Sequence, residues 1–357
     1  MCRFLRTQRP KKALTALALW LVALSYGLWL QSGPRILDEG WTWPSSSEGM
    51  MMLADAHPML FGLLNYPLIQ LGASPQMLGY VGAALAALAV PLVYWTFGLI
   101  PALVLLFSPA LTWAMGYHRH HALVLPVLAL YLLALRKNSE TLLLFTASLM
   151  ALTHFQTQVV LLTTLPFYRR ETLLRLILVL GYNPLAWWEF FRLFALVSAG
   201  VGVQITYYSG FLQSVFGSSL LAGLVGVVAG LGAWIGPLYV SAGAVGLTLT
   251  LFLAARAADI YSAPTGLLVA VLVGVGLERL LRRKRLLGLG VMAAVLWGLG
   301  STAWEKGQLI HQQRQAEARR TLEGPYVVHP GLPDATLLRL NGYQGIILCP
   351  AERLRVQ

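Results

Sequence analysis

Two adjacent carboxylates, Asp38 and Glu39, stand in the segment PRILDEGWTW at residues 34–43, directly after the first long apolar run. The next segment, SSSEGMMMLADAHP, adds Asp55 and His57. Charged residues make up only 11% of the sequence, so a paired acid at this place is unusual. A carboxylate held near a substrate hydroxyl can act as a general base, and Asp38 and Glu39 are therefore candidates for catalysis.

Four later segments carry polar side chains that could bind an anionic substrate. YHRHH at 117–121 surrounds an arginine with histidines, and THFQTQ at 153–158 interrupts an apolar run. Arginine can hold a phosphate through two N–H donors, and ionisable groups near bilayer depth are costly and hence functional candidates. The residues concerned are His118, Arg119, His120, His121, His154, Gln156, Glu189, Arg192, Tyr207, Tyr208, Arg256, Asp259 and Tyr261.

Each of these features also has a plainer explanation. Asp38 followed by Gly40 is typical of a solvated turn, and Arg256 with Asp259 has the spacing of an ion pair on a helix surface. YHRHH could be a wet loop, because three histidines in four residues cannot all face one ion on a helix, which disfavours a dedicated metal site. The functional interpretation requires all these segments to reach the same side of the protein.

The elements that must position these residues are membrane-spanning helices. The chain has 357 residues, of which 57% are hydrophobic, and a mean hydropathy of +0.67. A soluble protein of this length could not hide so much apolar surface in one core. The apolar runs approach the roughly 20 residues that cross a bilayer, and they do not alternate as the strands of a membrane barrel do. The sequence therefore predicts an all-α polytopic membrane protein.

The net charge of +12 does not indicate nucleic-acid binding, because the placement of the basic residues fits membrane topology. Basic residues cluster before residue 13 and in the segments 136–137, 169–175 and 279–285, which is the bias of cytoplasmic loops. We therefore expect a multi-pass protein of the plasma (inner) membrane with a cytoplasmic N-terminus, contacts with membrane lipids and no nucleic-acid partner. Cys2 and Cys349 then lie on opposite sides of the membrane, which argues against a disulfide between them.

The apolar runs predict 10 or 11 spans. The first, 13–31, is too long for a signal peptide and is expected to be retained. The first outer loop, 32–73, contains a short apolar segment at 57–72 that is expected to lie in the interface. Residues 142–168 are expected to form two short helices around THFQTQ, whose turn must be buried in protein or wet. The other crossings are 74–98, 99–116, 122–135, 176–187, 217–236, 238–256, 265–277 and 286–304.

The remaining residues, 304–357, are expected to form a small extracytoplasmic tail. Its first part, EKGQLIHQQRQAEARRTLEG, is polar and helix-prone. Three short β-rich runs follow, YVV, TLLRL and GIIL, divided by Gly and Pro.

The order of these features resembles the GT-C superfamily of polytopic glycosyltransferases, in the branch of the protein O-mannosyltransferases and the lipid A aminoarabinose transferases. Asp38 and Glu39 stand where this branch carries an Asp-Glu pair after its first span. Successive family segments are similar to HPMLFGLLNYPLIQLG, SPALTWAMGYHRHHALVLPVLALYLLAL, LMALTHFQTQVVLLTTLPFYRR and YSAPTGLLVAVLVGVGLERLLRR. The resemblance covers about residues 13–300 and implies a GT-C-like transmembrane domain at 1–303.

The resemblance implies an inverting enzyme that moves a sugar from a polyprenyl-phosphate donor to an acceptor on the extracytoplasmic face. Asp38 becomes the general base, and Glu39 supports it. A leaving phosphate needs cations, which assigns donor binding to Arg119, Arg192 and Arg256, and the family's Arg-Tyr pair before a late span adds Tyr261. Substrate binding is assigned to Asp55, His57, His118, His120, His154 and Asp259. A cavity wide enough for a prenyl chain is expected between the outer loops and the bilayer.

The sequence departs from the family pattern at His120, which follows Arg119 where relatives often carry an acid. A carboxylate ligand is thereby lost, so no cofactor is assigned and a divalent metal is not favoured, although imidazoles could bind a softer metal. The small tail favours a lipid or glycan acceptor, or a partner subunit. Two other classes stay open: a lipid or solute transporter, which would usually place charge near the midplane and show repeats, and a non-catalytic GT-C-like scaffold subunit.

Overall fold

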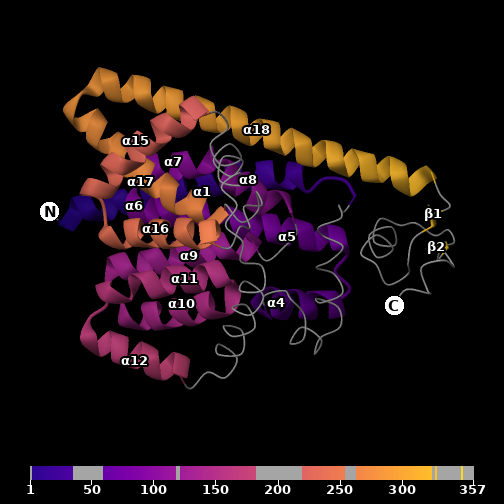
Figure 1. Cartoon of the computed structure of the whole chain (residues 1–357), viewed down its shortest axis with the longest axis horizontal. Helices are drawn as coiled ribbons and strands as arrows, with labels where there is room; N and C mark the ends of the chain where they lie inside the picture. Colours follow the sequence, from indigo (N-terminus) through magenta and orange to yellow (C-terminus); the bar gives the residue numbers. More distant parts are fainter. Residues whose placement is uncertain are drawn as a thin grey trace.

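The computed structural model describes residues 2–34, 59–117, 121–181, 219–253, 263–323, 326–327 and 347–348. This part of the chain is a bundle of helices (Figure 1). In chain order they are α1 (Cys2–Leu30), α4 (Met59–Gln70), α5 (Pro75–Ala87), α6 (Ala89–Phe97), α7 (Leu99–Leu106), α8 (Pro109–Gly116), α9 (His121–Lys137), α10 (Glu140–Thr153), α11 (Phe155–Thr164), a 3-10 turn (Leu165–Phe167), α12 (Arg170–Gly181), α15 (Ser219–Ile235), α16 (Leu238–Leu253), α17 (Ala263–Arg283) and α18 (Arg285–Glu323).

Several of these helices are able to cross a membrane. Among the described residues, four stretches are long and apolar enough, and they lie in α1, in α5 with α6, in α17 and in α18. The pair α7 and α8, bent by 58°, makes a fifth if it is one broken span. The predicted helical architecture is thus confirmed, with four or five stretches that could span a membrane, whereas the count of 10 or 11 spans and the GT-C arrangement stay predictions.

Helix breaks divide the bundle at defined residues. The bend between α7 and α8 falls at Phe107 and Ser108, where the Ser108 hydroxyl accepts a hydrogen bond from the Ala110 backbone N–H at 3.1 Å. Pro109 follows, and its missing N–H suits the first position of a new helix. The predicted crossing at 99–116 is therefore built from two short helices rather than one.

One end of the bundle is basic. Arg136 and Lys137 end α9, Arg282 and Arg283 end α17, and Arg285 begins α18. The Arg136 guanidinium lies 5.4 Å from the ring centroid of Phe97, the last residue of α6. We call this the basic end, and its composition is the one expected of a cytoplasmic surface.

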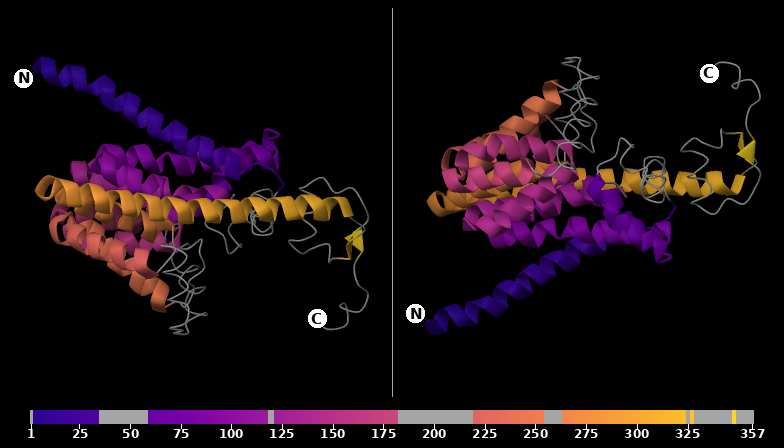
Figure 2. Two further views of the ribbon diagram at one scale, coloured as in Figure 1. Left: turned by 90° about the horizontal axis from the view of Figure 1, so that it is seen from above. Right: turned by 90° about the horizontal axis from the view of Figure 1, so that it is seen from below.

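At the opposite end, α1 and α8 stop beside the middle of α18. The Tyr26 hydroxyl donates to the Ala303 carbonyl at 3.0 Å, and the rings of Trp29 and Trp304 stack with centroids 5.1 Å apart. We call this the loop end, because Pro34 and Tyr117 lead from it into the segments predicted to carry the carboxylate pair and the His–Arg cluster. Figure 2 shows α18 running along the bundle and continuing beyond this end.

The short apolar segment after the first loop is helical, as its length suggested. α4 has 12 residues with Pro67 inside, which gives about 18 Å of helix and is too short to cross a bilayer. It contacts α10. Its predicted place in the membrane interface stays a prediction.

The tail begins as a continuation of the last span. α18 has 39 residues and passes residue 304 without a break, so residues 305–323 continue the same helix. Beyond it, β1 (Tyr326–Val327) pairs in parallel with β2 (Ile347–Leu348). Strand structure is thus confirmed within the runs YVV and GIIL, whereas TLLRL lies outside the described residues. The division into a transmembrane domain and a tail stays a prediction.

Glycines allow α15 and α17 to pack in close contact. A Cβ atom at Gly232 would lie 1.8 Å from the Leu272 carbonyl oxygen, and one at Gly276 would lie 2.3 Å from the Val228 carbonyl oxygen. Small residues at such crossings let two membrane helices approach closely, and dispersion contacts then hold them together.

We expect Gly232→Ala to lower the free energy of unfolding by about 1–3 kcal/mol, because the helices must separate to admit the methyl group. Gly230→Ala is the matched control on the same helix, since nothing lies within 4 Å of the added Cβ atom. Thermal unfolding in detergent micelles measures both. Equal melting temperatures for the two variants would contradict the close packing of α15 on α17.

Candidate functional site

Most residues predicted to form the site lie outside the described part of the chain. These are Asp38, Glu39, Asp55, His57, His118, Arg119, His120, Glu189, Arg192, Tyr207, Tyr208, Arg256, Asp259 and Tyr261. His121, His154 and Gln156 are described. The candidate site is therefore built from these three residues and from the helix ends that lead into the other segments.

His154 forms the break between α10 and α11. Its backbone is extended, with φ −171° and ψ 153°, and its Nδ1 accepts a hydrogen bond from the Gln156 backbone N–H at 3.3 Å. The His154 backbone N–H donates to the Thr157 hydroxyl oxygen at 3.2 Å, and that hydroxyl donates to the Met150 carbonyl at 2.6 Å. The predicted pair of short helices around THFQTQ is confirmed, with histidine as the N-cap of the second helix.

The polar turn is enclosed by protein. His154 is 3% exposed, and Gln156 and Thr157 are fully buried. Gln158 donates from its side-chain amide to the Ala151 carbonyl at 2.8 Å, which satisfies one of the carbonyls left at the end of α10. The expectation that this turn must be buried in protein or wet is met by burial, because lipid could not supply these hydrogen bonds.

His121 packs directly against His154. The two imidazole centroids are 5.2 Å apart and the ring planes are tilted by 53°. His121 begins α9 and is the last residue of the YHRHH segment, and it is also buried. The structure therefore brings together two residues that the sequence pattern placed on the same side of the protein.

The hydrogen bond at Nδ1 determines what His154 can do chemically. A neutral imidazole that accepts at Nδ1 carries its proton on Nε2, so the ring offers an N–H donor there. A metal ion would need the lone pair of that nitrogen instead. The ring therefore acts as a hydrogen-bond donor at Nε2 rather than as a metal ligand.

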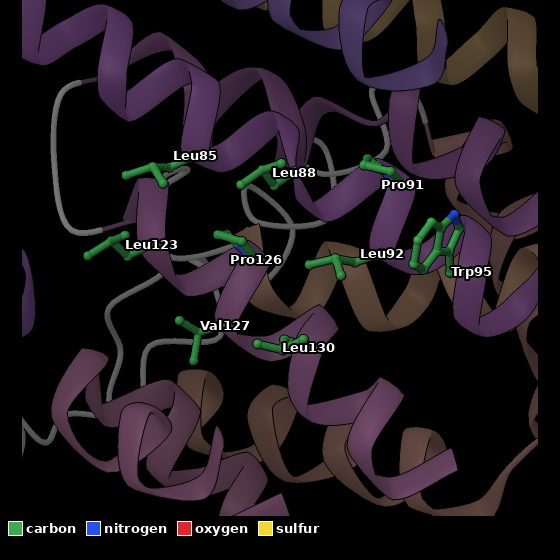
Figure 3. Close-up of a pocket in the computed structure, with 9 residues that line it drawn as sticks. All are labelled: Leu85, Leu88, Pro91, Leu92, Trp95, Leu123, Pro126, Val127 and Leu130. Carbon is green, nitrogen blue, oxygen red and sulfur yellow. The ribbon is translucent and has the colours of Figure 1, made fainter. Parts of the chain in front are cut away.

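An apolar groove of about 370 Å³ lies between α9 and the pair α5–α6 (Figure 3). Leu85 and Leu123 lie toward one end of it, and Trp95 lies toward the other. Trp95 is 60% exposed, so the groove opens on the outer surface of the bundle, where lipid would lie. Leu123 is two residues after His121 on α9, so the groove begins within one helical turn of this histidine, on a different face of the helix.

The groove forms where the first helix of this wall is broken. α5 ends at Ala87, Leu88 separates it from α6, and Pro91 and Pro126 face the hollow from the two walls. Its volume is at the lower end of the roughly 300–1,000 Å³ found for ligand sites. The predicted cavity beside the outer loops involves segments outside the described residues, and this groove is a separate feature along the helices.

Sequence reasoning missed one buried charged residue, Arg314 of α18. Its side chain is fully buried at the loop end and donates hydrogen bonds to α1 and α8. The available signal was the spacing of Gly307, Ile310 and Arg314, which places them on one face of a helix. Residues 305–323 are polar on every side of this helix, so hydropathy did not single out the face that carries Arg314.

Comparison with known proteins adds no family assignment, because the chain matches no protein-family model and no curated protein. The likeness to GT-C glycosyltransferases therefore depends on the sequence motifs, and its functional consequences are proposals.

Proposed function

We propose that the protein is a membrane glycosyltransferase, which moves a sugar from a polyprenyl-phosphate donor to a lipid or glycan acceptor at the loop end. One observation carries this proposal: helix α9 begins at a buried polar pair, His121 and His154, and an apolar groove runs along the same helix from Leu123 to Leu130. A lipid-linked sugar has a polar head and a long hydrocarbon chain, so it needs polar groups and an apolar surface side by side.

The reaction would be a single displacement. Asp38 takes the proton of the acceptor hydroxyl, whose oxygen attacks the anomeric carbon while the bond to the phosphate oxygen breaks on the opposite face. The electron pair of that bond leaves with the polyprenyl phosphate, and the configuration at carbon inverts. Arg119, Arg192 and Arg256 stabilise the phosphate charge, and the Nε2–H of His154 donates to an oxygen of the donor head.

The distribution of charge supports an extracytoplasmic site. The basic end of the bundle fits a cytoplasmic surface, and the polar residues predicted to act on substrate lead from the loop end. We therefore assign the loop end to the outside of the plasma (inner) membrane. No observation in the described residues favours the scaffold or the transporter over this enzyme.

The experiment that tests the function supplies donors to the purified protein in sealed lipid vesicles. Polyprenyl-phosphate sugars are added with a lipid extract as acceptor, and mass spectrometry follows the free polyprenyl phosphate and the glycosylated product. We expect both products to appear in equal amounts. Absence of turnover with every donor, together with movement of donor or solute across the membrane, would assign the protein to the transporters.

Filling the groove should weaken binding of long-chain donors. Leu88→Trp places an indole ring in the hollow, and we expect the KM for a long-chain donor to rise about tenfold, while a short-chain water-soluble donor changes little. Val227→Trp is the control, since Val227 is exposed on α15 and does not line the groove. Steady-state kinetics with both donors measures the effect. An equal change for the two donors would show that the groove does not hold the chain.

A further inference from the structure

A single buried guanidinium joins the helix ends from which two predicted site loops begin. Arg314 donates from Nε to the Leu30 carbonyl at 2.8 Å, and from Nη1 to the Pro34 carbonyl at 2.7 Å. Its Nη2 donates to the Gln31 side-chain oxygen at 3.1 Å and to the Gly116 carbonyl at 2.8 Å. We call these five residues the Arg314 cluster.

Two of the acceptors are carbonyl groups at helix C-termini, which can stabilise a buried cation. Leu30 is the last residue of α1 and Gly116 is the last residue of α8. Carbonyl groups at a helix C-terminus lack partners within the helix and carry the partial negative charge of its dipole. Arg314 therefore caps two helices at once, and their converging dipoles help to stabilise its charge away from water.

Further contacts hold the same region together. Gln31 donates from its side-chain amide to the Met115 carbonyl at 2.6 Å, and Gln76 of α5 donates to the Gln31 carbonyl at 2.7 Å. The Tyr117 hydroxyl donates to the Gln313 side-chain oxygen at 3.2 Å. The chain at the end of α1, the end of α8 and the outer part of α18 are thus connected by side-chain hydrogen bonds.

Two glycines make this close approach geometrically feasible. Gly33 has φ +103°, which favours glycine, and a Cβ atom there would lie 3.5 Å from the Cβ atom of Arg314. At Gly116 an added Cβ atom would lie 2.5 Å from Cδ1 of Ile310, so α18 sits directly on the end of α8. The cluster has little room to adjust to another side chain.

We infer that Arg314 is a positioning residue that fixes the starts of the two loops relative to each other. Pro34 is four residues before Asp38, and Gly116 is three residues before Arg119. Losing the guanidinium would release both starting points, so the proposed base and the proposed phosphate ligand would lose their alignment. The catalytic consequence rests on the proposed function, whereas the geometric role does not depend on it.

The test uses the full-length protein with Arg314→Ala, Arg314→Lys and the control Arg319→Ala, an exposed arginine of the same helix. Hydrogen–deuterium exchange is measured in peptides covering 29–38 and 112–120, with and without millimolar methylguanidinium. We expect exchange to accelerate in these peptides in Arg314→Ala and to return toward wild type with methylguanidinium. Arg314→Lys should show a smaller acceleration, because an ammonium group cannot reach four acceptors in a planar fork.

Kinetics provide the second readout. We expect Arg314→Ala to lower kcat about 100-fold with a donor KM within about threefold of wild type, and methylguanidinium to restore part of kcat. Unchanged exchange in both peptides would overturn the positioning role. If exchange responds as expected but the wild type transfers no sugar, the proposed function fails and the positioning role stands. If Arg314→Ala does not fold, hydrogen–deuterium exchange in the two peptides of Arg314→Lys decides alone whether Arg314 has the positioning role.

Discussion

Replacement of Asp38 by asparagine is expected to abolish glycosyl transfer while leaving the fold intact. Asparagine has the size of aspartate but cannot take the proton of an acceptor hydroxyl, and a general base contributes about 10²–10⁴-fold to a rate. Transfer from a polyprenyl-phosphate sugar is measured with the purified variant, and thermal unfolding shows that it is folded.

Two neighbouring acids provide controls for this result. Glu39→Gln should reduce transfer less than Asp38→Asn, because Glu39 is assigned a supporting role. Glu48→Gln removes an acid of the next segment to which no role is assigned, and this variant should transfer at the wild-type rate. A folded Asp38→Asn variant with unchanged transfer would eliminate the base assignment, and a scaffold or a lipid flippase would behave in this way.

The second large effect is expected at His154, where two properties of the ring can be separated. His154→Asn keeps an oxygen near the position of Nδ1, and asparagine is a favoured N-cap, so α11 should keep its start. The donor at Nε2 is lost. We expect a melting temperature close to wild type and a fall in kcat of about 10²-fold, the usual effect of removing one donor from a charged transition state.

His154→Leu is the comparison that removes both properties. It should lower the free energy of unfolding by about 0.5–2 kcal/mol through loss of the cap, in addition to lowering kcat. Circular dichroism melts and single-turnover kinetics measure the two effects. If His154→Asn transfers sugar as fast as wild type, the Nε2 donor has no part in the reaction and His154 serves the fold alone.

Local patterns predicted local structure well. The polar residues of THFQTQ inside an apolar run gave the break at His154, because a helix in lipid cannot leave such groups unsatisfied. The pair Ser108–Pro109 carried an equally good signal for the bend between α7 and α8, yet 99–116 was expected to cross as one element. The hydropathy of residues 99–116 favoured a single span, and this signal outweighed the helix start indicated by Ser108 and Pro109.

Contacts between distant segments could not be predicted from one sequence. Arg314 and Leu30 are 284 residues apart, and neither residue carries a pattern that points to the other. Likewise, the sequence pattern placed His121 and His154 on the same side of a membrane, but it did not predict that their rings would be in contact. The number of spans depends on segments such as 182–218, which lie outside the described residues.

The central claim is that the protein acts on a lipid-linked sugar, and mass spectrometry of the lipids that co-purify with it tests this most directly. The wild-type protein and Leu88→Trp are purified in the same mild detergent and their bound lipids are extracted. We predict a polyprenyl-phosphate sugar bound to the wild type and depleted in Leu88→Trp, with bulk phospholipids equal in both. Bulk phospholipids alone in both preparations would contradict the account.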